Sequence, residues 1–187
     1  MQKIAVVAGK VFMPEQGKTN LLALDFFALF QEPCCFFTDP AKLVHKYHQL
    51  VSTTHPDRFT NATDTEKKYA LLLTARINEG WKTLSQPLER ACYLLLLRGI
   101  DIKNTADIAL PKDFFVEQIT WRESIDEARY NRQTLNILLN QLKMQVLALT
   151  KTLDQTANKD LRATALLVKK WCFLDKLIQE INGAKKY

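Results

Sequence analysis

The chain has 187 residues, of which 47% are hydrophobic, so it is long enough for one large or two small domains with packed cores. Five glycines and six prolines are few, which favours helices joined by short connections over an all-β architecture. No apolar run reaches the roughly 18 residues that a membrane span needs. The formal net charge of +6 comes largely from Lys and Arg on helical faces opposite apolar stripes, so neither a membrane nor a nucleic acid is an expected partner.

Residues 1–20 lack both the cleavage site of a secretory signal and the arginines of a mitochondrial presequence. We expect them to form a poorly structured N-terminal extension. The four cysteines contain no CxxC pair and no regular framework, which fits a reducing cytoplasm better than a secreted, disulfide-stapled domain.

A helical pattern begins near residue 21. The aromatic segment from Leu24 to Phe30 predicts a short helix that Pro33 ends. Asp39, directly before Pro40, predicts the start of a second helix. Apolar side chains recur along this helix at Leu43, Tyr47, Leu50, Val51 and Thr54, and its opposite face carries Lys42, His45, Lys46 and Gln49. The helix therefore has an apolar side for its own domain and a basic side for water or a partner.

The tripeptide His55-Pro56-Asp57 ends the second helix and begins a polar loop that runs to about Thr63. Proline has no amide proton and a restricted φ, so Pro56 should stop the helix and make the turn rigid. A third helix with an apolar stripe from Tyr69 to Leu84 should pack antiparallel on the second, and another helix follows Pro87. In isolation, the tripeptide could equally be a polar turn without further function.

Beyond Gly99, three more helical patterns appear, and together they predict an antiparallel bundle. The first runs from about Pro111 to Arg129, the second has its stripe at Leu135, Leu138, Leu142, Val146, Leu149 and Leu153, and the third at Leu167, Trp171, Leu174, Ile178 and Ile181. The near-heptad spacing would also fit a coiled coil between chains, but the short connections favour packing within one chain.

The helix from Pro111 carries two neighbouring lines of side chains. One line consists of Phe114, Gln118, Trp121 and Ile125, and the other of Phe115, Ile119, Arg122 and Glu123. One line can face the core and leave the other exposed. Whether the second line is core or interface stays open, because apolar stripes are more often buried.

The ordered set of segments resembles the HscB family of co-chaperones over roughly residues 24–182. The segments are Asp25 to Phe30, Tyr47 to Phe59 with its HPDRF core, Ala75 to Leu84, then Pro87, Arg90, Ala91, Tyr93 and Leu94, Phe115 to Ile119 with Arg122, Glu123, Asp126 and Glu127, and Phe173 to Leu177. Two positions depart from the family, since bacterial relatives tend to carry an acidic residue at Thr120 and a basic one at Cys172. The contact set of the C-terminal domain is therefore open.

The resemblance implies an all-α protein with an N-terminal J-domain at residues 21–100, which is an antiparallel helical hairpin with an HPD loop, and a C-terminal three-helix bundle at residues 108–183. It implies a co-chaperone that stimulates ATP hydrolysis by an HscA-type chaperone of the DnaK class and delivers the IscU-type iron–sulfur scaffold protein to it. Such a chain is not an enzyme, and the cluster resides on the scaffold. His45 and His48 could share a metal with Cys34 or Cys35, but no second pair completes a tetrahedral site at a familiar spacing, so neither a metal nor a cofactor is predicted. The adjacent pair Cys34-Cys35 differs from the CxxC motifs of eukaryotic relatives, which favours a bacterial cytoplasmic protein.

The resemblance also implies two sets of binding residues. The expected chaperone-binding residues are His55, Pro56, Asp57, Arg58, Lys42 and Lys46. Of these, Asp57 can offer its carboxylate to an arginine, Pro56 limits the entropy lost on docking, and the basic side chains would steer an acidic chaperone surface. The expected scaffold-binding residues are Phe115, Val116, Ile119, Arg122 and Glu123, which combine apolar anchors with a charged rim.

Two other functions fit parts of the sequence. The chain could serve a general DnaK-class chaperone with other clients, and it would then not bind the scaffold. It could also be a basic helical nucleic-acid binder, which would show salt-sensitive binding to DNA or RNA.

Overall fold

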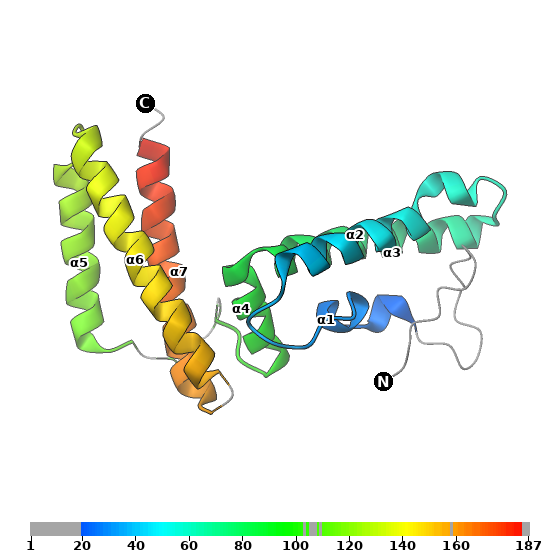
Figure 1. Ribbon diagram of the computed structural model, residues 1–187, viewed down its shortest axis with the longest axis horizontal. Coiled ribbons are helices and arrows are strands. Elements are labelled where there is room, and N and C mark those ends of the chain that lie inside the picture. The colour runs from blue at the N-terminus through cyan, green and yellow to red at the C-terminus, as the bar shows by residue number, and fades with distance from the viewer. Residues whose placement is uncertain (1–19, 103, 105–107, 109, 158, 185–187) are drawn as a thin grey trace. The chain divides into compact units, whose positions relative to one another are not determined.

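The computed structural model describes residues 20–184 except 103, 105–107, 109 and 158. Every regular element formed by these residues is a helix, so the predicted all-α class is confirmed (Figure 1). None of the helices in this part of the chain combines the length and apolar character that a membrane crossing requires. The chain forms two compact units that divide between Arg90 and Ala91, ahead of the domain end expected near residue 100.

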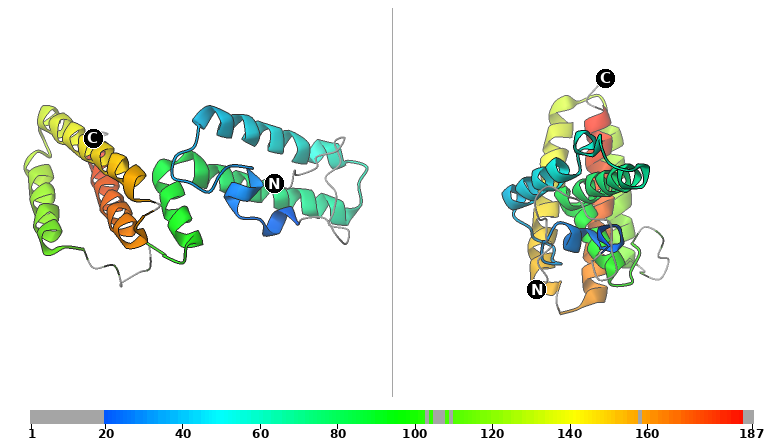
Figure 2. Two further views of the ribbon diagram at one scale, coloured as in Figure 1. Left: turned by 60° about the horizontal axis from the view of Figure 1, so that its bottom comes forward. Right: turned by 90° about the vertical axis from the view of Figure 1, so that its right-hand side faces the viewer.

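The first unit is built on an antiparallel pair of helices, α2 and α3. Its elements in chain order are the 3-10 turn η1 (Leu21–Ala23), α1 (Phe26–Leu29), α2 (Pro40–Thr54), the 3-10 turn η2 (Pro56–Phe59) and α3 (Asp64–Ser85). The helices α2 and α3 lie side by side in every view, and α1 packs on α3 (Figures 1 and 2). Phe27, Leu29, Phe30 and Ile77 are at most 1% exposed and form the centre of the core. Each such side chain contributes about 1.5–3 kcal/mol through its removal from water.

Local signals in the sequence set the ends of these helices. The Asp39 side chain accepts the amide hydrogen of Ala41 at 2.9 Å, so it caps α2 as predicted. Thr63 and Glu66 form a reciprocal capping box that starts α3.

The end of α1 differs from the prediction. The helix stops at Leu29, well before Pro33, because Gln31 adopts a left-handed backbone with φ of 54°. The amide of Glu32 then bonds back to the carbonyl of Phe27 at 2.9 Å, which is the hydrogen-bond pattern of a helix C-cap. The expected role of Pro33 as the helix stop is therefore wrong.

A buried arginine joins the last turn of α3 to the loop before α2. Arg90 is 7% exposed; its Nε donates to the carbonyl of Phe36 at 2.9 Å, and its Nη1 donates to that of Leu84. Burial lowers the pKa of Arg90 below its usual value, and an electrostatic interaction with Cys35 partly opposes this shift. The guanidinium thus serves as a structural hydrogen-bond donor.

The second unit is a helical bundle. The helix α4 (Pro87–Leu97) carries the chain into this unit, and α5 (Lys112–Glu127), α6 (Arg132–Thr156) and α7 (Leu161–Ala184) follow. The helices α6 and α7 pack along each other, and α5 contacts α7 (Figure 2). The main core cluster consists of Ile125, Ala128, Leu135, Leu139, Leu142, Leu174, Leu177 and Ile181. The apolar stripes therefore pack within one chain, as predicted.

Candidate functional site

The turn at the end of α2 presents the His55-Pro56-Asp57 tripeptide. Residue His55 ends the helix in an extended conformation with φ −59° and ψ 132°, and Pro56 begins the 3-10 turn η2. The His55 side chain accepts the Asp57 amide hydrogen at 3.4 Å, and its Nδ1 lies 3.4 Å from Asp57 Oδ2. The Asp57 side chain is 86% exposed. Its carboxylate can therefore be reached by a partner without any rearrangement of the turn.

The base of this turn is tied to both neighbouring helices. Thr54 is 1% exposed, and its carbonyl accepts a hydrogen bond from the Thr74 hydroxyl of α3 at 3.2 Å. Beyond the turn, Phe59 is 9% exposed and is buried against α3 by the packing of η2. Arg58 Nη1 donates to the carbonyl of Ser52 at 2.9 Å. An exposed carboxylate thus stands on a well-anchored backbone, which is the arrangement that limits the entropy cost of docking.

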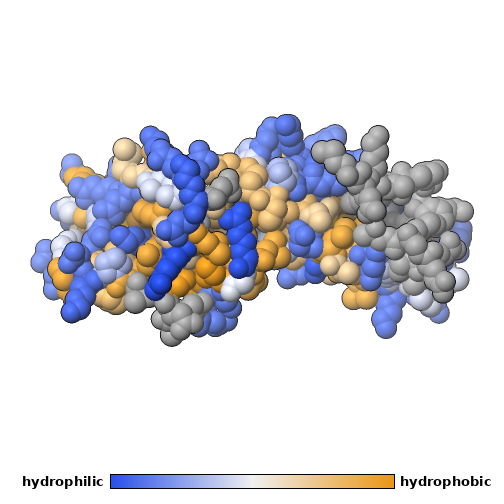
Figure 3. Space-filling view, turned by 90° about the horizontal axis from the view of Figure 1, so that it is seen from below, coloured by the Kyte–Doolittle hydropathy of each residue, from blue (hydrophilic) through white to orange (hydrophobic). Residues whose placement is uncertain are grey.

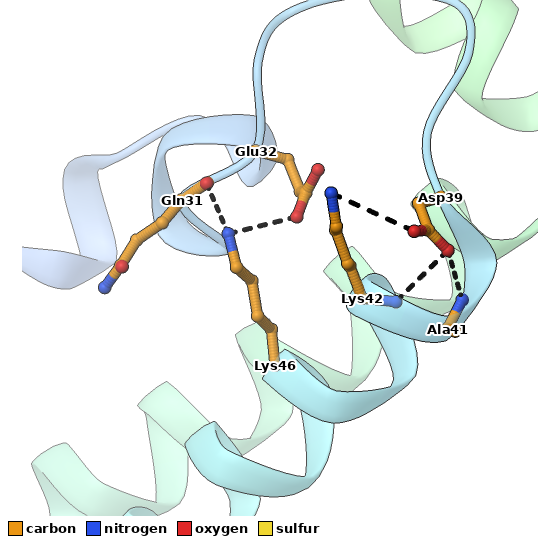
Figure 4. Close-up of polar contacts among 6 residues, drawn as sticks. All are labelled: Gln31, Glu32, Asp39, Ala41, Lys42 and Lys46. Carbon is orange, nitrogen blue, oxygen red and sulfur yellow. Dashed lines mark hydrogen bonds and ion pairs between the residues drawn. The ribbon is translucent and has the colours of Figure 1, made fainter.

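The two basic residues predicted on α2 have different surroundings (Figure 4). The Lys42 side chain is 73% exposed and lies 4.0 Å from the carboxylate of Asp39. The Lys46 amine donates to the Gln31 carbonyl and pairs with Glu32 at 3.0 Å. The Lys46 and Glu32 side chains are only 28% and 7% exposed. Lys42 therefore offers its charge to solvent, whereas much of the Lys46 charge is neutralised within the first unit.

The second set of predicted residues lies together on the outward face of α5. Phe115, Val116 and Ile119 are 52%, 64% and 58% exposed, and Arg122 and Glu123 are exposed beside them. The neighbouring line faces the core, since Phe114 is 3% and Ile125 4% exposed. Phe114 also makes an edge contact with Phe173 of α7 at 5.4 Å between ring centroids. The line from Phe115 is therefore exposed and is not part of the core.

Exposed apolar side chains also occur outside the face of α5. The face in Figure 3 shows apolar side chains between hydrophilic ones. On α6, Ile137 and Met144 are 54% and 66% exposed, and with Trp121 of α5 they line a shallow groove. Ile137 and Met144 were not among the predicted surface residues, although they are seven residues apart on α6 and lie outside its main apolar stripe.

The predicted chaperone-binding residues lie in the first unit and the predicted scaffold-binding residues in the second, and Lys42 lies at the end of α2 far from the turn. His55, Asp57 and Arg58 share the turn, with Lys42 and Lys46 on the preceding helix, whereas the α5 residues belong to the second unit. Sequence reasoning missed Glu32 as the partner of Lys46, and no local pattern around Glu32 would have indicated it.

Within the described residues, no three His, Cys, Asp or Glu side chains form a group that could hold a metal ion.

Comparison with known proteins extends over both units. Residues 110–182 match the family described as the HSCB C-terminal oligomerisation domain. A protein of Chromobacterium violaceum named "Co-chaperone protein HscB homolog" is 42% identical over 162 residues, which cover 86% of this chain and 93% of that protein. A protein of the same name from Aromatoleum aromaticum is 37% identical over 167 residues, covering 87% and 94%.

Two solved structures share the fold. The crystal structure of human co-chaperone protein HscB aligns with a TM-score of 0.81 and 27% identity, covering 87% of this chain and 83% of the human chain. The chaperone HscB from Vibrio cholerae aligns with a TM-score of 0.76 and 26% identity, covering 87% of this chain and 98% of that one. The similarity therefore includes the turn after α2 as well as the C-terminal bundle.

Proposed function

This chain belongs to the HscB co-chaperone family, and from that membership we propose that it stimulates ATP hydrolysis by an HscA-type chaperone of the DnaK class and delivers an IscU-type scaffold protein to it. The chain would thereby aid the maturation of iron–sulfur proteins in a bacterial cytoplasm. Residues 21–100 would act as the J-domain and residues 108–183 as the scaffold-binding bundle. The chain itself would catalyse no reaction, and the cluster would stay on the scaffold.

The observation that carries the chaperone half of the proposal is the 86% exposed carboxylate of Asp57 on an anchored turn. A carboxylate in this position can accept a charge-assisted, bidentate hydrogen bond from a partner arginine. Arg58 beside the turn and Lys42 in the first turn of α2 are both exposed, and their positive charge would speed the encounter with an acidic surface.

The test is single-turnover ATP hydrolysis by the chaperone with wild type and Asp57→Asn. The substitution removes the charge and keeps the shape, so stimulation should fall by roughly 10- to 100-fold, as expected for one charge-assisted hydrogen bond. The matched control is Asp154→Asn, which makes the same change at an exposed position of α6 and should stimulate like wild type. Full stimulation by Asp57→Asn would refute the assignment of the turn.

The scaffold half of the proposal rests on the exposed apolar residues of α5. Side chains such as Phe115 and Ile119 gain free energy when a partner covers them, and charged neighbours at the rim select the partner. The scaffold should therefore bind to the face formed by Phe115, Val116, Ile119, Arg122 and Glu123.

A Phe115→Ala/Ile119→Ala double variant should weaken scaffold binding by roughly 10- to 100-fold in calorimetry, because it removes two apolar anchors. The matched control is Ile137→Ala/Met144→Ala, which truncates two similarly exposed apolar residues on α6. The control should keep its affinity. Retained affinity in the α5 variant would show that the scaffold binds elsewhere.

A further inference from the structure

Two cysteines that are far apart in sequence meet inside the second unit. Cys92 of α4 and Cys172 of α7 are separated by 80 positions, and their Sγ atoms lie 3.8 Å apart. Both residues belong to the unit that begins at Ala91. All four cysteines of the chain lie in its described part, and none of them forms a disulfide.

We propose that Cys92 and Cys172 form a reversible disulfide when they meet a low-molecular-weight disulfide such as oxidised glutathione. The sulfur atoms of a disulfide are about 2.05 Å apart, so the two thiols need to approach by less than about 2 Å. Rotation of the two side chains on their helices can supply a movement of this size. This site is independent of the function proposed above.

The exposure of the two thiols sets the order of the reaction. Cys172 is partly exposed, whereas Cys92 is 8% exposed and shielded from an external reagent. The Cys172 thiolate would attack one sulfur of oxidised glutathione and release one glutathione thiolate. The Cys92 thiolate would then attack the Cys172 sulfur, form the internal disulfide and release the second glutathione. The two protons lost by the cysteines pass to the two glutathione thiolates, and the oxidised glutathione takes up both electrons.

The other two cysteines do not meet the same requirement. Cys34 and Cys35 are adjacent, and Cα atoms across a trans peptide lie about 3.8 Å apart, below the range of about 4.4–6.8 Å found in disulfides. The described chain contains no cis peptide that would alter this spacing. The Cys35 thiol also donates to the Phe37 carbonyl at 2.9 Å. The pair therefore serves as an internal control for selectivity.

The disulfide would stabilise the second unit by joining α4 to α7. It would close a loop of 80 positions and so remove much of the conformational freedom of the unfolded chain. Cys172 directly precedes Phe173, whose ring packs on Phe114 of α5. In a reducing cytoplasm both residues would rest as thiols, so the bond would form only under oxidative conditions.

The test uses the full chain equilibrated in mixtures of reduced and oxidised glutathione, quenched in acid and alkylated. As the oxidised share rises, two alkylatable thiols should disappear together. Trypsin should release a cross-linked peptide that joins residues 91–98 to residues 171–176. The melting temperature should rise by at least about 5 °C.

Two variants complete the experiment. Cys34→Ser/Cys35→Ser should form the same cross-link, and Cys172→Ser, at a partly exposed position, should lose both the cross-link and the rise in melting temperature. Three results would overturn the proposal: Cys172 present only as a mixed disulfide with glutathione, a disulfide between two chains, or a cross-link between Cys34 and Cys35.

Discussion

Lys42 and Lys46 lie one helical turn apart on α2, but their side chains differ in solvent exposure and in ion pairing. The Lys42 amine is largely in solvent, while Lys46 is paired with Glu32, whose side chain is 7% exposed. A surface charge contributes mainly to the rate of an electrostatically steered encounter. A pair with one nearly buried member contributes to stability, because removing one partner leaves the other charge without compensation.

We therefore expect Lys42→Ala to slow association with the chaperone at low salt and to leave the free energy of unfolding unchanged. The effect should fade as salt rises, since the Debye length is about 10 Å at 0.1 M. Stopped-flow binding at two salt concentrations checks this expectation. An equal slowing at high salt would mean that Lys42 makes a short-range contact instead.

Lys46→Ala should lower the free energy of unfolding by about 1–2 kcal/mol, because it leaves the mostly buried carboxylate of Glu32 unpaired. Urea denaturation provides the measurement. Lys42→Ala is the matched control, since it removes the same charge from the same helix.

The sequence predicted the positions of both lysines but not their difference. Spacing along α2 places them on the basic face, and that part of the prediction depends only on helical geometry. The approach of Glu32 depends on the left-handed backbone at Gln31, which reverses the chain after α1. A non-glycine residue in that region is uncommon, and tertiary packing rather than local preference determines it.

At the scale of the elements, the contact between α1 and α3 depends on the absence of a side chain. A Cβ atom at Gly80 of α3 would lie 2.8 Å from Cε2 of Phe30 and 3.0 Å from Cδ1 of Phe26. Both rings are buried, at 1% and 6% exposed, so neither can swing into solvent without opening the core. Gly80 thus permits the short helix α1 to reach its place on the hairpin.

Gly80→Ala should lower the free energy of unfolding by about 1–3 kcal/mol, the usual cost of overpacking a core. Urea denaturation measures the change. The control is Gly183→Ala in α7, where an added Cβ meets nothing within 4 Å and should leave stability unchanged or slightly raised. A neutral result at Gly80 would mean that α1 can shift to accommodate the methyl group.

Helix starts and helix faces that depend on local sequence could be predicted. Features that depend on tertiary packing were predicted less well. The start of α2 follows from Asp39 and Pro40, and the two lines of α5 were separated correctly. The 3-10 turn η2 was expected only as a polar loop, because the burial of Phe59 against α3 is a tertiary contact. In α7, Val168 and Leu177 are buried, whereas the predicted Leu167 and Trp171 are only partly so. Where several adjacent residues are apolar, helical spacing alone does not determine which of them is buried in the core.

At the scale of the whole molecule, one chain carries both proposed binding surfaces. Covalent connection makes the second binding event intramolecular and raises the effective concentration of the two partners for each other, up to millimolar values for short flexible connections. The scaffold's effect on chaperone stimulation should therefore require both surfaces on the same chain.

A mixture of full-length Asp57→Asn with full-length Phe115→Ala/Ile119→Ala tests this expectation. Each variant keeps one surface, and neither keeps both. In single-turnover ATP hydrolysis the mixture should stimulate like the second variant alone and gain no enhancement from the scaffold. Wild type at the same total concentration is the control. Full enhancement in the mixture would show that delivery does not need the connection.

The Thr74 hydroxyl of α3 donates to the Thr54 carbonyl at the end of α2, and we expect amide exchange to differ on the two sides of this bond. Amide hydrogens at the buried end of α2 should exchange with deuterium slowly, since they open only with the hairpin. The amide of Asp57, bonded at 3.4 Å to the exposed His55 ring, should exchange quickly. A docked partner would then appear as new protection at Asp57, with no change in the helix that supports it.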